Sequence, residues 1–289
     1  MRAVIFDWFW DALRDAIELM LELIVANTIY ELDNSLLWSP LNTAMPVVYD
    51  FVITIIANVT GPIGLTLVSM FLILELIGRL TKDYDSQTGV GTLHMVLVVA
   101  IKLMAFKLII DFAPMLLRLI YEYARSIILG IRSTTFDAGE VSLLAGSAAD
   151  IPNGGGLFVV LIILIVALLV SSLLPIIVTI LVALRFFELY IYMAFAPISL
   201  ATLANEETRR VGDGFIKSFA GVALQGAILL LVVFIYPMIL ASLLPESPQG
   251  SYAQAQEVIV FALGVLGYCI AAIIMLFASS RLAAKITGG

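Results

Sequence analysis

Charged residues are scarce in this sequence: they make up 13% of its 289 residues, whereas apolar residues make up 62%. A soluble globular domain has about a quarter charged and about half apolar residues, so the composition excludes an ordinary soluble protein. The long apolar runs instead predict an all-α, polytopic membrane protein. The net charge of −7 gives no support to a nucleic-acid-binding surface, because a phosphate polymer is held by clustered Lys and Arg.

Cysteine and histidine are almost absent. Cys269 is the single cysteine, which excludes a disulfide within the chain and a cluster of cysteine ligands around a metal. His94 is the single histidine and is expected at a membrane interface. No Ser/His/Asp set and no pair of carboxylates falls on a water-accessible loop, so we expect no enzymatic activity, no cofactor and no metal. We also expect no cleaved signal peptide, since the first apolar segment carries several acidic residues.

The first helix is predicted over residues 6–27 and carries acidic side chains on one face. They recur at spacings of three and four and are Asp7, Asp11, Asp15, Glu18 and Glu22. Because the opposite face is apolar, the helix is predicted to be amphipathic and to lie in the membrane interface. As a spanning helix it would bury several charges at about 2.5–3.5 kcal/mol each. Residues 1–57 are therefore assigned to this helix and an extracytoplasmic linker.

Residues 58–289 are predicted to form a transmembrane domain, because they contain apolar runs that reach the roughly 20 residues needed to cross a bilayer. The five predicted crossings are Asn58 to Gly78, Leu93 to about Ile128, Leu157 to about Met193, Phe215 to Leu240 and Val258 to Phe277. The second and third exceed a hydrocarbon core of ~30 Å and must tilt or project beyond it. Small and polar residues over 131–156 predict a flexible outer loop, and residues 197–217 are assigned to a cytoplasmic elbow.

The distribution of basic residues predicts the orientation in the membrane. Seven fall on one side and three on the other, which favours the first side as cytoplasmic. The seven are Arg79, Lys82, Arg209, Arg210, Lys217, Arg281 and Lys285, and the three are Arg2, Arg14 and Arg132. The N-terminus is then outside and the C-terminus inside. An arrangement with a sixth crossing over 186–204 weakens this bias and is rejected.

Five charged residues lie on one narrow stripe of the second crossing, within about 60° of one another at 100° per residue. They are Lys107, Asp111, Arg118, Glu122 and Arg125. Facing lipid, they would together cost on the order of 10–15 kcal/mol, so they are expected to face protein or water. Two interpretations remain open: an internal ladder of i,i+4 and i,i+3 ion pairs, or a wet seam between subunits or along a conduit. Lys102 points elsewhere and is expected to snorkel to an interface.

Two further pairs of opposite charge have helical spacing. Glu75 and Arg79 are four residues apart in the first crossing, and Arg185 and Glu188 are three apart in the third. Both are predicted to be ion pairs that reduce the cost of burial and fix helix contacts. Pro197 follows the second pair, and because proline has no N–H and disfavours helix at the residue before it, a turn is predicted there.

The stretch from Leu184 to Arg210, "LRFFELYIYMAFAPISLATLANEETRR", resembles one family together with "GPIGLTLVSMFLILELIGRLTKDYD" before it and "SRLAAKI" near the end. The family is the polytopic inner-membrane channel component of type IV secretion systems, in the TrbL superfamily, and the compact form of Gram-positive conjugative elements is especially similar. The resemblance covers most of the chain in order. Its most specific positions are Arg185, Glu188, Tyr190, Tyr192, Ala196, Pro197, Asn205, Glu206, Gln225 and Gly226.

The resemblance implies a homo-oligomeric channel or scaffold subunit of a conjugation machine in the cytoplasmic membrane, surrounded by membrane lipids. Its implied partners are the other type IV secretion subunits, including the transfer ATPases, and transiently or indirectly the translocated single-stranded DNA with its relaxase. Two alternatives are kept: a secondary transporter of a small solute, although no internal repeat is found, and a purely structural anchor of a larger assembly.

Overall fold

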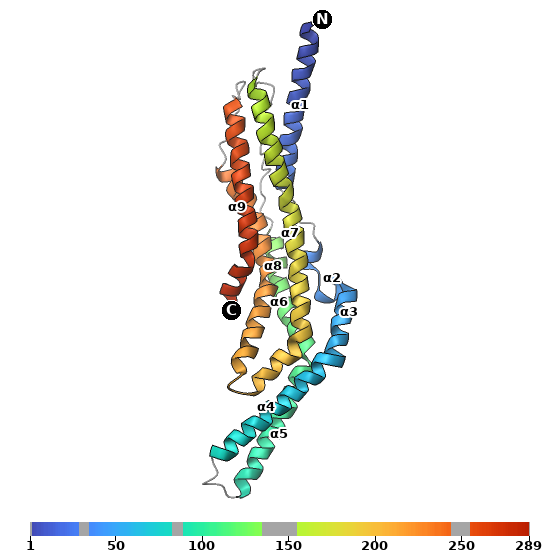
Figure 1. Ribbon diagram of the computed structural model, residues 1–289, viewed down its shortest axis with the longest axis vertical. Coiled ribbons are helices and arrows are strands. Elements are labelled where there is room, and N and C mark those ends of the chain that lie inside the picture. The colour runs from blue at the N-terminus through green and yellow to red at the C-terminus, as the bar shows by residue number, and fades with distance from the viewer. Residues whose placement is uncertain (1, 29–34, 83–88, 135–154, 244–254, 289) are drawn as a thin grey trace. The chain divides into compact units, whose positions relative to one another are not determined.

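The computed structural model describes residues 2–28, 35–82, 89–134, 155–243 and 255–288, and these residues form helices and turns without any β-strand (Figure 1). In chain order the elements are α1 (Arg2–Thr28), η1 (Ser35–Trp38), α2 (Leu41–Ala44), α3 (Pro46–Ile55), the π-helical turn η2 (Ile56–Thr60), α4 (Gly61–Lys82), α5 (Gly89–Asp111), α6 (Ala113–Ser133), α7 (Gly155–Ala201), η4 (Thr202–Ala204), α8 (Arg209–Leu243) and α9 (Ala255–Thr287). The prediction of an all-α, polytopic membrane protein is confirmed.

Four helical segments among the described residues are long and apolar enough to cross a membrane. They are Pro46–Gly78, Phe158–Ala204, Arg209–Ile235 and Leu266–Thr287. Each overlaps one of the five predicted crossings, and the second predicted crossing, from Leu93 to about Ile128, is not among them. The first begins at Pro46 and not at Asn58, because α3, η2 and α4 follow one another without a break. Most of the surface of these segments is not buried within the chain, so lipid or other subunits must cover it.

The predicted second crossing is not one helix. The helix breaks at Phe112, between α5 and α6, so the expectation of a continuous helix from Leu93 to Ile128 is wrong. Pro114 explains the break, because proline has no N–H to donate to the carbonyl of the preceding turn and its ring crowds that carbonyl. The charged residues of the predicted stripe are therefore divided between two helices.

α7 does not end at Pro197 as predicted. It continues to Ala201, giving a helix of 47 residues, and the chain leaves the helical conformation at Asn205, whose backbone is extended (φ −115°, ψ 137°). Because Pro197 has no N–H for the helical ladder, it accounts for the bend in the last turns of α7 in Figure 1. The turn itself covers residues 202–208, and the rest of the predicted elbow, as far as Lys217, already belongs to α8.

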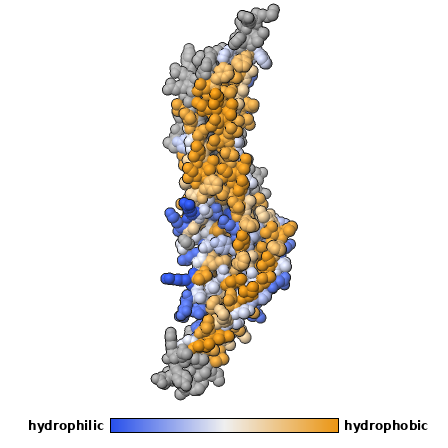
Figure 2. All heavy atoms as spheres, in the orientation of Figure 1, coloured by the Kyte–Doolittle hydropathy of each residue, from blue (hydrophilic) through white to orange (hydrophobic). Residues whose placement is uncertain are grey.

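The chain divides into two compact units. Unit 1 comprises Met1–Ser35, Gly130–Val182 and Ile228–Ser279, and unit 2 comprises Leu36–Leu129, Ala183–Ala227 and Ser280–Gly289. In unit 1, α7 buries one residue on each turn: Val160, Leu164, Ala167, Ser171, Leu174 and Val178. Spacings of three and four are those of a helix packed along one stripe. On the face shown in Figure 2, the described surface of unit 1 is predominantly apolar, which is compatible with contact to acyl chains.

α1 confirms the helix predicted at the N-terminus. Its buried residues are Ile17 and Ile24, and the exposed acidic residues of its predicted face are Asp11, Asp15, Glu18 and Glu22. The side chain of Asp7 and residues 135–154, which form most of the predicted outer loop, lie outside the described part of the chain. The position of α1 in the membrane interface stays a prediction.

Unit 2 has a core that joins α4, α5 and the end of α7. Its buried members are Val68, Leu72, Ile110, Ala201 and Ala204. α8 and α9 also meet in this unit, because a Cβ added to Gly221 would lie 3.0 Å from Oγ1 of Thr287. Glycine at this position therefore allows the start of α8 to approach the end of α9 closely.

Candidate functional site

Arg185 is a buried charged residue of unit 2 and the centre of its polar contacts. Its side chain is 1% exposed. Nε donates to the carbonyl of Val222 (3.1 Å) and Nη2 donates to that of Ala223 (2.8 Å), so α7 is tied to α8 by a side chain bonded to backbone. The predicted ion pair with Glu188 is not formed, because Glu188 is exposed on another face of α7. Arg185 is thus held by carbonyl dipoles and not by a carboxylate.

Gly226 provides the space that the guanidinium occupies. A Cβ added at this position would overlap the Arg185 side chain, with its Nη1 and Cζ atoms as the nearest neighbours. Two residues that were predicted only as separate motif positions therefore belong to one junction between α7 and α8. The neighbouring motif residue Gln225 is also buried, with 6% of its surface exposed.

Two aromatic rings, one from α6 and one from α7, lie close to the guanidinium of Arg185. The Cζ atom lies 5.6 Å from the ring centroid of Tyr121 and 5.7 Å from that of Phe186. Both distances are within the range of a cation–π interaction, which is stronger where water is excluded. Nη1 has no hydrogen-bond partner among the described residues, so these ring faces form part of its electrostatic environment.

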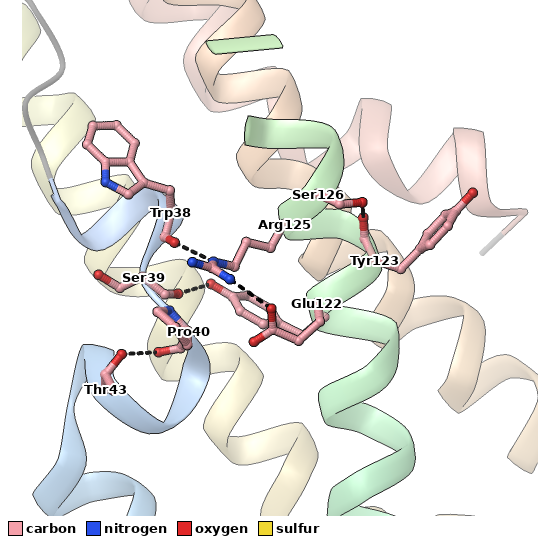
Figure 3. A network of polar contacts seen from close by, with 9 residues as sticks. Trp38, Ser39, Pro40, Thr43, Glu122, Tyr123, Arg125 and Ser126 are labelled. Atoms are coloured by element: carbon pink, nitrogen blue, oxygen red, sulfur yellow. Dashed lines mark hydrogen bonds and ion pairs between the residues drawn. The ribbon is translucent and has the colours of Figure 1, made fainter. Parts of the chain in front are cut away.

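Three side chains from α6 and α7 hold the irregular segment that contains η1 and α2. Arg125 Nε donates to the carbonyl of Trp38 (2.6 Å; Figure 3), and the hydroxyl of Tyr121 donates to that of Ser39 (2.7 Å). The hydroxyl of Tyr190 donates to the carbonyl of Leu41 (2.7 Å). These bonds give three backbone carbonyls of this segment the donors that a long regular helix would otherwise supply.

The predicted charged stripe separates into an internal part and an exposed part. Arg125 Nη1 lies 3.0 Å from Glu122 Oε2, and both side chains are half-buried. Lys107, Asp111 and Arg118 are exposed, and the predicted pairs Lys107–Asp111 and Arg118–Glu122 are not formed among the described residues. The ladder interpretation therefore holds only at the end of the stripe nearest the Arg185 junction. The other three charges require partners outside the chain or water.

Glu75 pairs with a residue that sequence reasoning assigned elsewhere. Lys102 Nζ of α5 lies 2.6 Å from Glu75 Oε1 of α4, so Lys102 does not snorkel away from the protein as expected. The side chain of Arg79, the predicted partner of Glu75, lies outside the described part of the chain. The observed pair joins two helices, whereas the predicted one would have stayed within a single helix.

The end of the motif stretch packs α7 against α4 and α8. A Cβ added to Gly64 would lie 2.6 Å from the carbonyl oxygen of Pro197, so α4 and α7 cross at a point where only glycine fits. Ala196 is fully buried. The ring of Tyr192 lies 5.4 Å from that of Phe215 of α8. The motif residues Pro197 and Tyr192 therefore lie where α7 packs against α4 and against α8.

The turn between α7 and α8 is closed by its own polar side chains. Asn205 Oδ1 accepts a hydrogen bond from the N–H of Glu207 (2.9 Å), and the hydroxyl of Thr208 donates to the carbonyl of Thr202 (2.7 Å). Glu206 is exposed and points away from these contacts. Asparagine commonly fixes turns in this way, because its short side chain bonds to backbone two residues on.

A scan against protein families matches residues 26–197 to the TrbL/VirB6 plasmid conjugal transfer like proteins. The chain belongs to this family. Searches of curated proteins and of solved structures gave no match. Family membership confirms the resemblance noted in the sequence and identifies the protein as a membrane component of a conjugal transfer, type IV secretion apparatus.

The residues matched to the family include Arg185 of α7 but end before α8, which Arg185 contacts. Arg185, Tyr190 and Pro197 lie within the matched residues, as does the segment of η1 and α2 that Tyr190 holds. Asn205, Glu206, Gln225 and Gly226 follow the matched residues. The carbonyl acceptors of Arg185 are therefore contributed by a part of this family member that the match does not include.

Sequence reasoning missed Tyr121 at the Arg185 junction; at other helix contacts it missed Gly64 and gave Lys102 a different role. Tyr121 was not singled out because an aromatic residue in an apolar helix gives no signal of its own. Its spacing of four from both Leu117 and Arg125 does place it at the border between the buried and polar sides of α6. The contact of Gly64 with Pro197 was missed because it joins helices that are far apart in the sequence. The pairing of Lys102 with Glu75 was missed because it joins two helices across a loop. No group of three or more His, Cys, Asp or Glu side chains able to hold a metal occurs in the described residues.

Proposed function

We propose that this member of the TrbL/VirB6-like family is a channel or scaffold subunit that oligomerises in the cytoplasmic membrane and helps single-stranded DNA pass with its relaxase. The observation that carries the proposal is the exposed charge on α5 and α6. Lys107, Asp111 and Arg118 form no ion pair among the described residues, although exposed apolar side chains such as Leu108, Phe112 and Met115 lie beside them along the two helices. Charges among apolar side chains that face a bilayer require a neighbouring subunit or a water-filled passage.

The amphipathic character of α6 supports the same proposal. Its buried face is Ala113, Leu117, Tyr121, Ala124 and Ile128. The exposed side of α6 is mixed: it carries Arg118 and the side chain of Tyr123, which is 75% exposed, beside apolar residues such as Met115 and Leu119. A helix that faces only acyl chains on its outer side would carry no charge there. Arg118 therefore suits an assembly in which another copy of the chain or water covers this part of α6.

We further propose that the ends of α8 and α9 in unit 2 face the cytoplasm and the transfer ATPases of the apparatus. The exposed basic residues at these two ends are Arg209, Arg210, Lys217, Arg281 and Lys285. Hydrophilic side chains gather in this part of unit 2 in Figure 2. A concentration of Lys and Arg beside membrane-spanning helices favours the cytoplasmic side.

A crosslinking experiment in cells tests the proposed role. The photoreactive residue p-benzoyl-phenylalanine replaces Lys107 in one variant and the apolar, exposed Ile162 of α7 in a control variant. Each is expressed in a donor strain whose own copy of the gene is deleted. During active conjugation, the proposal expects DNA crosslinked at position 107 and none at position 162. Transfer that proceeds without DNA crosslinking at position 107 would favour a structural anchor, and transfer that does not need the gene would refute both.

A further inference from the structure

Glu188 is a carboxylate on an apolar, outward-facing side of α7. Its exposed neighbours are Leu184 (50%), Phe187 (60%) and Ile191 (45%). Glu188 is itself exposed and forms no ion pair among the described residues. It lies in the 47-residue segment Phe158–Ala204, which is long and apolar enough to cross a membrane. Neither acyl chains nor these apolar neighbours offer a hydrogen-bond donor to a carboxylate, so Glu188 is expected to meet a polar or basic group from outside the chain.

Arg118 is the corresponding cation on α6. It is exposed and forms no ion pair among the residues that the structure describes. Its exposed neighbours Met115 (56%) and Leu119 (57%) are apolar. The nearest carboxylate along α6, that of Glu122, is already bonded to Arg125. Glu188 and Arg118 are therefore an anion and a cation on different helices of unit 2, each without an ion-pair partner among the described residues.

Glu188 and Arg118 lie at nearly the same level along the axes of α7 and α6. α6 and α7 run antiparallel in unit 2 (Figure 1), and their register is fixed where the rings of Tyr121 and Phe186 meet at 6.1 Å. Glu188 follows Phe186 by two residues, about 3 Å along α7, and Arg118 precedes Tyr121 by three residues, about 4.5 Å along α6. Both steps lead in the same direction, so the two side chains start within about 1.5 Å of one level.

We infer that Glu188 of one copy of the chain binds Arg118 of the next copy. The two residues lie on different helices, so the contact joins two different surfaces, and repetition of such a contact produces a ring when the rotation closes. Arginine suits this position because its guanidinium binds a carboxylate through two parallel hydrogen bonds. The inference rests on the proposed oligomerisation and specifies which faces meet.

Crosslinking between differently tagged copies tests the contact directly. Glu188→Cys carries one tag and Arg118→Cys carries another, the two chains are co-expressed, and the membranes are treated with a bismaleimide of about 10 Å reach. The only native cysteine, Cys269, is buried, and Cys269→Ala in both chains removes it as a second target. A product that contains both tags is expected. In the matched control, the second chain carries Met104→Cys, at an exposed position of α5, in place of Arg118→Cys. This pair is expected to give no product that contains both tags.

Charge exchange supplies an independent readout that does not depend on crosslinker geometry. Glu188→Arg and Arg118→Glu are each expected to reduce the recovered oligomer and the conjugation frequency by roughly tenfold or more, and the double exchange to restore most of both. A double variant no better than the single ones would overturn the inference. So would a crosslink formed only within one chain when both cysteines are placed in it.

The outcomes separate this inference from the proposed function. If the wild-type chain is oligomeric and needed for transfer, but copies do not crosslink between positions 188 and 118, the contact is wrong and the channel proposal stands. If the wild-type chain is monomeric in membranes during active transfer, the proposed oligomeric function fails, and the contact fails with it.

Discussion

Arg185 shows how a single side chain can fix two helices without a counter-charge. Its Nε and Nη2 atoms bind two carbonyls of α8, and aromatic rings cover the remaining face of the guanidinium. Arginine is suited to this position because it is more weakly hydrated than lysine and presents a flat, delocalised cation. Lysine would offer one point charge and could not reach the same two acceptors in the same geometry.

Gly226→Ala is predicted to destabilise the protein by about 1–3 kcal/mol, because the added methyl group overlaps the guanidinium and must displace it. The measurement is the thermal unfolding of the purified chain in detergent. Gly214→Ala in the same helix is the matched control, since a Cβ there meets nothing within 4 Å. Replacing Arg185 by methionine should remove most of the penalty of Gly226→Ala. Equal penalties for Gly226→Ala in both backgrounds would show that the two residues are not coupled.

Tyr190→Phe is predicted to loosen the segment that contains α2. Removal of the hydroxyl leaves the carbonyl of Leu41 buried without its donor, which destabilises by about 1–3 kcal/mol. Hydrogen exchange of residues 41–44 should become faster, and Tyr123→Phe, whose ring is largely exposed, should leave the rate unchanged. Unchanged exchange in Tyr190→Phe would mean that the hydroxyl does not hold this segment.

At the scale of elements, proline and glycine determine where helices break, bend and cross. Pro114 divides α5 from α6, and Pro197 bends α7 without ending it. Gly64 lets α4 reach the backbone of α7 at Pro197. Proline therefore separates two helices at position 114 but only bends one helix at position 197, because the surrounding packing decides whether the helical conformation continues after the proline.

Exchanging the charges of Glu75 and Lys102 tests the pairing of α4 with α5. Each single reversal is predicted to destabilise by about 1–3 kcal/mol, because it places like charges opposite one another at a partly buried site. The double exchange should recover at least half of the loss in a thermal unfolding cycle. A double variant that loses the sum of the two single losses would contradict the pair.

The sequence predicted the helices well and their partners less well. Apolar runs and helical spacing depend on local composition, so all four segments long enough to span were anticipated. The partner predicted for Arg185 was wrong because i,i+3 spacing is only a local rule, and its side chain reaches another helix instead. Glu75 also reaches another helix, through Lys102, whereas its pairing with Arg79 stays a prediction because the Arg79 side chain lies outside the described residues. Glu122–Arg125 obeyed the local rule because both residues lie on one side of α6.

At the scale of the whole molecule, the proposed orientation rests on the exposed basic residues at the start of α8 and the end of α9. A cysteine in place of Lys285 is predicted to react with a membrane-impermeant maleimide only in inverted vesicles or permeabilised cells, and a cysteine in place of Arg132 only from outside intact cells. Both side chains are exposed, so burial does not prevent labelling. Labelling of position 285 in intact cells would reverse the proposed topology.

The central claim is that the charged residues of α5 and α6 are shielded from acyl chains by neighbouring copies or by water. Spin labels at Asp111→Cys and Arg118→Cys, in the assembled protein in liposomes, measure this through their accessibility to oxygen, which concentrates in the hydrocarbon core. A label at Ile162→Cys, a residue that is 61% exposed on α7, gives the value for a lipid-facing site. The account predicts much lower oxygen accessibility at positions 111 and 118 than at 162, and equal accessibility at all three would contradict it.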